Sequence, residues 1–272
     1  MTARERPWSV WLAIPIALTA LVAGVLAFAI AGAIRDALVT LPQHAQGLTG
    51  VAADGTPPAE TITSTVVQDV VLAAGVLVAA WIATGRRRAR GALGLGSARV
   101  GSSVAYVVVG YVLFLVISGL WTSLLGVTGR DNVAVELGSR DSAGALVAAG
   151  LLVGAVAPVA EELFFRGFVF GALRRHGFWP AAVVSGLLFG GAHVASSPIG
   201  FLLPLAALGV ILCAVYERTG SLLPGIGLHC LNNSVALGAG DGREWVVPAC
   251  LLVSGVAIAL FVRGLRRVVP AG

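Results

Sequence analysis

The chain has 272 residues, of which 57% are hydrophobic and only 11% are charged. Soluble domains carry about 25% charged residues, so this composition excludes an ordinary soluble enzyme and predicts an all-α membrane protein with several spans. The net charge of +5 does not indicate nucleic-acid binding, because the arginines stand beside apolar segments, where they meet lipid headgroups.

Apolar segments of helix length follow one another along the whole chain. We expect about eight transmembrane helices, each near the roughly 20 residues that a bilayer requires. They lie at residues 8–34, 64–84, 102–127, 146–173, 179–195, 199–216, 222–237 and 245–262. The first three, with an external loop and a cytoplasmic linker, form an N-terminal part (1–145), and residues 146–272 form a C-terminal core.

Arginine clusters mark one side of these spans. They precede the first span and follow the second, the fourth and the last. Their members are Arg4, Arg6, Arg86, Arg87, Arg88, Arg90, Arg174, Arg175, Arg263, Arg266 and Arg267. The loops on the other side hold acidic residues and only single arginines, so the positive-inside rule predicts that both termini are cytoplasmic. Lysine is absent and Ala, Gly and Val are abundant, which is typical of a GC-rich bacterial genome and indicates a bacterial plasma membrane.

The fourth span carries the first of three polar clusters. Glu162 and Arg166 are four residues apart with the glutamate first, which favours an ion pair on one helix face. Glu161 points about 100° away and has no partner on its own helix. Ionisable residues at bilayer depth are costly, so the cluster predicts a functional site. A structural Glu–Arg pair, with Glu161 facing water, is the alternative.

The other two clusters each contain a histidine. The fifth span has Phe189 four residues before His193, with glycines nearby that permit close helix approach. The seventh span has His229 and Asn233 one turn apart on one face. Asn232 points elsewhere and is interpreted as a structural amide. Hydrogen bonding between helices is an alternative explanation for each cluster taken alone.

The three clusters lie at similar depth. Glu161 comes 13 residues before Arg174, which puts it about 20 Å from the arginine-rich side, and His193 lies about as deep. His229 follows Arg218 by 11 residues, or about 16 Å. Helices of different direction thus bring polar groups to one level, which predicts a single water-filled cavity.

A carboxylate, two imidazoles and an amide can activate water and stabilise an oxyanion. Glu161, His193 and His229 could supply three ligands to a divalent metal such as zinc and leave a fourth position open. A metal-free arrangement is equally compatible with the sequence. In it Glu161 and His193 hold the water, and His229 and Asn233 face the developing oxyanion.

The three motifs resemble those of the CPBP intramembrane protease family. That family includes the type II CAAX prenyl endopeptidases and the bacterial Abi and bacteriocin-immunity relatives. The motifs are Glu-Glu-x-x-x-Arg at 161–166, Phe-x-x-x-His at 189–193 and His-x-x-x-Asn at 229–233, and the resemblance covers residues 146–237. It implies an all-α membrane fold and peptide-bond hydrolysis near the membrane.

The resemblance also implies a role for each motif residue. Glu161 would be the base that activates water, with His193 beside the same water. His229 and Asn233 would stabilise the oxyanion, and the Glu162–Arg166 pair would support the site. Members of the family are described both as metal-dependent and as glutamate-type proteases, so the resemblance leaves the metal open.

The sequence therefore predicts an intramembrane endopeptidase. Its partners would be the lipid bilayer and a peptide or protein substrate, presented from the cytoplasmic side. One alternative is a non-catalytic membrane adaptor or immunity-type protein, in which the polar residues hold helices together. Another is a proton-coupled transporter, although no internal repeat supports it.

Overall fold

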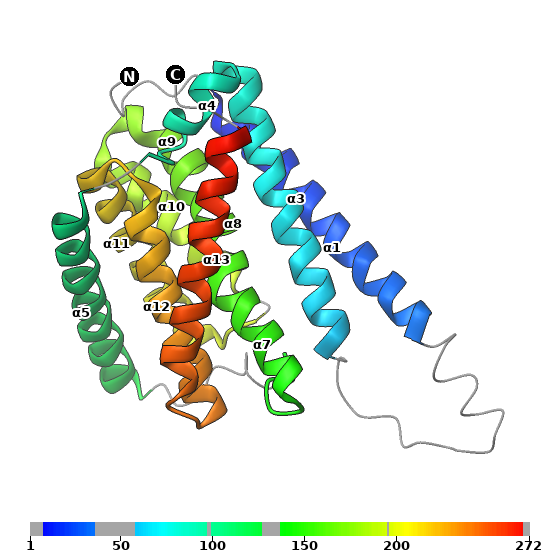
Figure 1. Ribbon diagram of the computed structural model, residues 1–272. Coiled ribbons are helices and arrows are strands. Elements are labelled where there is room, and N and C mark those ends of the chain that lie inside the picture. The colour runs from blue at the N-terminus through cyan, green and yellow to red at the C-terminus, as the bar shows by residue number, and fades with distance from the viewer. Residues whose placement is uncertain (1–7, 36–57, 97–98, 127–136, 195, 269–272) are drawn as a thin grey trace, which may run out of the picture.

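The computed structural model describes residues 8–35, 58–96, 99–126, 137–194 and 196–268. These residues form helices joined by short turns, with no strand among them (Figure 1). Five helices are long and apolar enough to cross a membrane, at Val10–Ile34, Pro58–Thr84, Val100–Leu125, Ala143–His176 and Ile199–Thr219. The protein is therefore an all-α, polytopic membrane protein, as its composition predicts.

Each of the eight predicted spans corresponds to helical residues. The first three are α1 (Ala13–Arg35, after a 3₁₀ turn at Val10–Leu12), α3 (Pro58–Thr84) and α5 (Val100–Leu125), with the short α4 (Arg86–Ala92) between the last two. The last four are α10 (Phe178–Ala192), α11 (Ile199–Thr219), α12 (Leu222–Asp241) and α13 (Val246–Val268). Three of these are not among the five long apolar spans: α10 is short, α12 carries His229 and two asparagines, and the apolar part of α13 is Val246–Leu260.

The fourth span is one continuous helix of changing pitch. It comprises α7 (Ala143–Leu151), the π-helical η3 (Leu152–Val156), α8 (Ala157–Glu162), the π-helical η4 (Leu163–Phe170), α9 (Gly171–Leu173) and the 3₁₀ turn η5 (Arg174–His176). At about 1.5 Å per residue, its 34 residues exceed the hydrocarbon thickness of about 30 Å, so a helix of this length tilts or extends beyond the hydrocarbon.

Most helix boundaries differ from the predicted ones by a few residues, and two of these differences bear on the site. The helix α3 begins at Pro58 rather than at residue 64, because proline suits the first turn, where its missing N–H has no partner to lose. The helix α10 ends at Ala192, so His193 caps its C-terminus instead of lying within the span. The predicted external loop lies outside the described residues up to position 57.

The helices divide into outer and inner ones (Figure 1). The antiparallel pair α1 and α3 forms one edge of the bundle and α5 the opposite edge, with the fourth span and α10 to α13 between them. Only 6% of the most apolar window of α5 is buried, against 50% for the fourth span and for α11. The fourth span and α11 therefore form the centre of the fold.

The described segments that carry arginine clusters, namely α4, η5 and the end of α13, lie at one end of the bundle, which we call the arginine end (Figure 1). Arg4 and Arg6 lie outside the described residues. The arginine end contains α4, η5, the start of α1 and the C-terminal ends of α11 and α13. Two contacts tie these segments together. The Arg174 guanidinium pairs with the Glu217 carboxylate, and the Leu222 backbone N–H donates to the Gly94 carbonyl at 2.8 Å.

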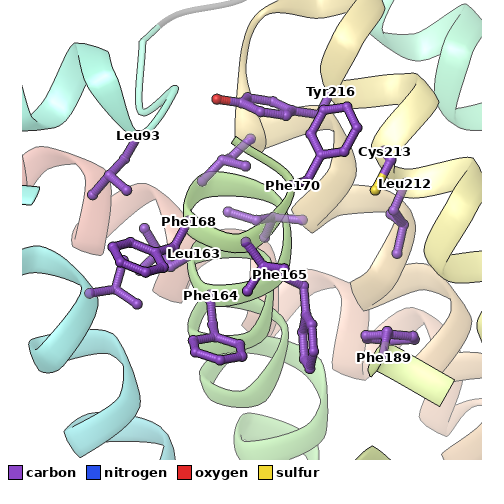
Figure 2. Close-up of a cluster of buried hydrophobic side chains, with 14 of the residues drawn as sticks. Leu93, Leu163, Phe164, Phe165, Phe168, Phe170, Phe189, Leu212, Cys213 and Tyr216 are labelled. Carbon is purple, nitrogen blue, oxygen red and sulfur yellow. The ribbon is translucent and has the colours of Figure 1, made fainter. Parts of the chain in front are cut away.

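Between α8 and the arginine end lies a group of large apolar side chains, which we call the aromatic plug. Its members are Leu163, Phe164, Phe165, Phe168, Phe170, Leu212 and Tyr216, with Trp8 and Leu93 packed against them (Figure 2). The Trp8 ring stacks on Phe168 with centroids 5.3 Å apart, and its indole N–H donates to the Phe168 carbonyl. Each member is at most 7% exposed, so the plug is a closely packed interior.

Candidate active site

The two glutamates of the first motif lie on α8, between the two π-helical segments. Such segments open the backbone hydrogen-bond ladder and occur frequently at functional sites. In η3 the Val153 carbonyl accepts a hydrogen bond of 2.9 Å from the Asn233 amide nitrogen of α12. A side chain of one motif thus binds the backbone just before another.

Glu162 and Arg166 form a buried ion pair on one helix face, as their spacing predicts. Their oxygen and nitrogen are 2.7 Å apart, and the two side chains are 1% and 0% exposed. The guanidinium also donates to the Gly209 carbonyl and lies 4.4 Å from the centre of the Phe189 ring. The arginine therefore has polar and aromatic partners on α10 and α11 as well as on its own helix.

His229 binds the same carboxylate from the opposite side. Its Nδ1 lies 3.2 Å from Glu162 Oε1. Because an ionised carboxylate only accepts hydrogen bonds, Nδ1 carries the proton, and the Nε2 of the neutral ring presents a lone pair. This Nε2 lies 3.9 Å from Glu161 Oε2. Glu162 thus sets both the orientation and the tautomer of His229.

His193 is held in the same way by a different acceptor. Its Nδ1 lies 2.8 Å from the Phe189 carbonyl one turn earlier, so this nitrogen is again the donor. Its Nε2 also lies 3.9 Å from Glu161 Oε2. The ring is half-buried, because the helix ends at Ala192 and the histidine caps it beside a turn.

Glu161 lies between the two imidazoles. Its Oε2 is buried and has no hydrogen-bond partner among the described residues, although the side chain as a whole is 19% exposed. Unpaired buried carboxylate oxygens are costly, so this atom is expected to bind a donor that protein atoms do not supply. A water molecule between the carboxylate and the two Nε2 atoms fits that requirement.

These side chains line a cavity of about 220 Å³. Its polar lining residues are Thr61, Thr65, Glu161, His193, Ser196, Ser197, His229, Asn232 and Asn233. Five of them were not predicted as site residues: Thr61, Thr65, Ser196, Ser197 and Asn232. The adjacent serines that follow His193 and the two threonines one turn apart near the start of α3 were the available signals.

Both asparagines of the third motif face this cavity. Asn232 donates from its amide nitrogen to Asn233 Oδ1 at 3.3 Å, so it does not point away from the site as its helical position suggested. The Asn233 amide nitrogen donates one of its two N–H groups to Val153, which identifies that atom as nitrogen and leaves the second N–H for a ligand.

The three candidate metal ligands do not close around an ion in this arrangement. Bonds of about 2.0–2.1 Å put neighbouring ligand atoms of a tetrahedral zinc ion about 3.4 Å apart. Here both imidazole nitrogens are 3.9 Å from the carboxylate oxygen, and no His, Cys, Asp or Glu group in the described part of the chain is arranged to hold a metal.

A further buried acid lies behind α8. Asp69 of α3 is 4% exposed, and its Oδ2 has no hydrogen-bond partner within the described segments. It lines a second cavity of about 220 Å³ together with Val156, Val159 and Ala160. It also lies near enough to Glu161 for the two charges to repel. An acidic residue in an apolar span was the sequence signal for this position.

Two comparisons relate this site to known proteins. Residues 143–235 match the family described as Type II CAAX prenyl endopeptidase Rce1-like, and all three motifs lie within that range. The chain is 27% identical over 142 residues to the "Putative membrane peptidase YdiL" of Bacillus subtilis (strain 168). That match covers 50% of this chain and 55% of the relative, so the chain spans about half the length of the curated relative it matches. No solved structure matches the chain.

The residues that the family model matches are those that form the candidate site. The matched range contains the fourth span, α10, α11 and most of α12, which are the helices that bring the motif residues together. The match supports a protease and does not distinguish a metal-dependent from a glutamate-type mechanism. Residues 143–235 of this membrane protein, which carry all three motifs, are therefore similar to the family described as Type II CAAX prenyl endopeptidase Rce1-like.

Proposed function

We propose that the chain is an intramembrane endopeptidase that hydrolyses a peptide bond with a water molecule activated by Glu161. The observation that carries the proposal is the buried Glu161 Oε2, which has no hydrogen-bond partner in the described structure and faces two imidazole nitrogens on a cavity wall. Hydrolysis within a membrane requires such an enclosed, wet and charged site.

The hydrogen bonds of the two histidines determine how water would bind. The carboxylate of Glu161 and the Nε2 of neutral His193 both accept, so one water can donate a hydrogen to each. Its oxygen lone pairs then point away from them, toward a substrate carbonyl carbon. Glu161 takes the proton as the water oxygen bonds to that carbon, and later delivers it to the leaving amine nitrogen as the C–N bond breaks.

Stabilisation of the oxyanion requires donors on the other side of the carbonyl. Asn233 has one N–H available. His229 can donate from Nε2 only when its ring is protonated, because its Nδ1–H is directed to Glu162. The Glu162 carboxylate stabilises that imidazolium, and Arg166 holds the carboxylate in place. The Glu162–Arg166 pair is thus assigned a positioning role.

The test compares two glutamate substitutions of equal size and charge change. Glu161→Gln should lower cleavage by about 10²–10⁴-fold, the range for loss of a general base, while the protein stays folded. Glu244→Gln removes an exposed carboxylate elsewhere and should leave cleavage unchanged. Membranes from cells that express each protein at equal levels would be searched for new peptide termini by mass spectrometry, with thermal stability measured on the purified proteins.

Termini that are present with wild type and Glu244→Gln and absent with Glu161→Gln, from equally stable proteins, would establish proteolysis. Equal termini with all three proteins would contradict the assignment of Glu161. A destabilised Glu161→Gln protein, with no wild-type-dependent termini, would indicate the adaptor function instead.

A further inference from the structure

We infer that the site receives its substrate from the end of the bundle opposite the arginine end, so that the substrate is a peptide segment on the extracytoplasmic side of the membrane. This inference rests on the proposed function, since it names the side and the kind of segment that the same site would cleave. It differs from the cytoplasmic presentation expected from the sequence.

The cavity extends from Glu161 toward the start of α3. Thr61 and Thr65 lie three and seven residues after Pro58, which puts them about 5 Å and 10 Å along α3 from its start. The start of α3 lies at the end of the bundle opposite α4 (Figure 1). Leu137, in the turn before α7, also lines the cavity. The cavity therefore connects Glu161 with that opposite end.

The wall of the cavity carries polar side chains. Toward the opposite end it carries hydroxyl and amide groups from α3, α12 and the turn after α10, namely Thr61, Thr65, Ser196, Ser197 and Asn232. These five side chains are half-buried, so each keeps contact with the outside. Such groups stabilise water and an extended peptide backbone.

Packed apolar side chains lie between Glu161 and the arginine end. From Glu161 toward the arginine end, the fourth span runs through Leu163–Phe170, about 12 Å of helix whose eight residues are all buried. Figure 2 shows that side chains of this segment project toward Leu93 on one side and toward Leu212 and Tyr216 on the other, all within the aromatic plug. Arg166, in the middle of this segment, has a side chain that is 0% exposed, so this segment offers no open path toward the arginine end.

The distribution of arginines indicates how the bundle is oriented in the membrane. The clusters of α4, of η5 and of the end of α13 all lie at the arginine end. Among the described residues, the opposite end has only single arginines, namely Arg35 at the end of α1, Arg140 and Arg243. The positive-inside rule assigns the richer end to the cytoplasm. The cavity then opens outward.

The lining also restricts the substrate. Among the described residues that line the cavity there is no arginine or lysine, and Glu161 supplies the one carboxylate. The described lining thus offers no guanidinium or ammonium group to hold a terminal carboxylate. It suits a neutral or basic internal segment that lies extended just outside the outer membrane surface.

Cysteine accessibility in intact cells tests the direction without requiring activity. The three buried native cysteines, Cys213, Cys230 and Cys250, would first be replaced by alanine. Thr61→Cys then places a thiol near the outer end of the cavity, and Ser102→Cys places one at an exposed position of α5 near the arginine end. Both substitutions exchange a small hydroxyl side chain for a thiol.

A membrane-impermeant sulfonated maleimide should label Thr61→Cys in intact cells and Ser102→Cys only after permeabilisation. The reverse pattern would overturn the inference, because the cavity would then open to the cytoplasm. Failure of Thr61→Cys to react even in permeabilised cells would also overturn it, because the cavity would then be closed at this end.

A second variant links the route to cleavage. Ser197→Cys lies on the cavity wall and outside the proposed catalytic groups. Labelling it in intact cells should abolish the cleavage that depends on Glu161, whereas labelling permeabilised Ser102→Cys should not. Continued cleavage by fully labelled Ser197→Cys would overturn the route. If no Glu161-dependent cleavage exists in the unlabelled protein, the proposed function fails while the accessibility result stands.

Discussion

The fourth span differs in character on the two sides of α8. Before it, residues 143–156 are mostly small, and Gly150 and Gly154 allow α13 to pack closely. After it, Leu163–Phe170 contains four phenylalanines and is entirely buried. The first half of this span thus lines the polar cavity, and its second half belongs to the apolar core near the arginine end. Side-chain size along a single helix therefore places the boundary between wet and dry regions at the two glutamates.

The largest effect is expected when a group that would bind water is removed from the cavity side of α8. His193→Ala should lower cleavage by about 10²–10⁴-fold, because the water loses its second acceptor. His176→Ala, at an exposed position in η5, is the matched control and should retain activity. Turnover of a mapped substrate peptide by the purified proteins is the measurement, and near-wild-type turnover of His193→Ala would contradict its role.

The next largest effect is expected at the Glu162–Arg166 pair, where the polar cavity and the apolar core meet. Arg166→Met leaves Glu162 as an unpaired buried charge and should lower the free energy of unfolding by about 3–5 kcal/mol. The double variant Glu162→Gln/Arg166→Met should recover part of that loss, because no buried charge remains. Thermal unfolding in detergent measures both, with Arg175→Met as the exposed control. Equal stabilities of Arg166→Met and Arg175→Met would show that the ion pair is dispensable.

Truncation on the dry side should affect stability more than chemistry. Phe168→Ala removes a fully buried ring that stacks on Trp8 and should cost about 3–5 kcal/mol. Leu187→Ala, at a position 55% exposed on α10, should cost far less. Turnover per folded molecule should stay close to wild type in both. A large loss of turnover in stable Phe168→Ala protein would mean that the plug takes part in catalysis.

The smallest effect is expected behind α8. Asp69→Asn keeps the shape of the side chain and removes a buried carboxyl group whose ionised form is costly, so it should raise the apparent Tm by a few degrees. Removal of the repulsion with Glu161 should change turnover only slightly. A lowered Tm would show that the Asp69 carboxyl has a stabilising partner, and a large loss of turnover would place it in the active site.

Parts of the candidate site could be predicted because they follow from helical periodicity. The pairing of Glu162 with Arg166 is set by their four-residue spacing. The glycines of α10 could also be interpreted in advance: Gly186 and Gly190 lie where a Cβ would overlap the backbone of α11. The face to which Asn232 points was not predictable in the same way, because it depends on the rotation of α12 against its neighbours.

The link between the two motif carboxylates and the histidines required the tertiary structure. Glu162 and His229 are 67 positions apart, and their hydrogen bond exists because α8 and α12 pack side by side. That bond decides which nitrogen of His229 carries the proton and hence which state can donate to an oxyanion. No spacing within one helix contains this information.

The sequence by itself determined the helical membrane class, the order of the spans, the arginine clusters and the three motifs, because hydrophobicity and local spacing are properties of consecutive residues. The tertiary structure decided that Glu161 Oε2 faces two imidazole nitrogens at 3.9 Å, that Asp69 lies behind it, and that the cavity leads away from the arginine end. These features depend on how helices rotate and pack against one another, and that packing is set by side chains distant in the chain.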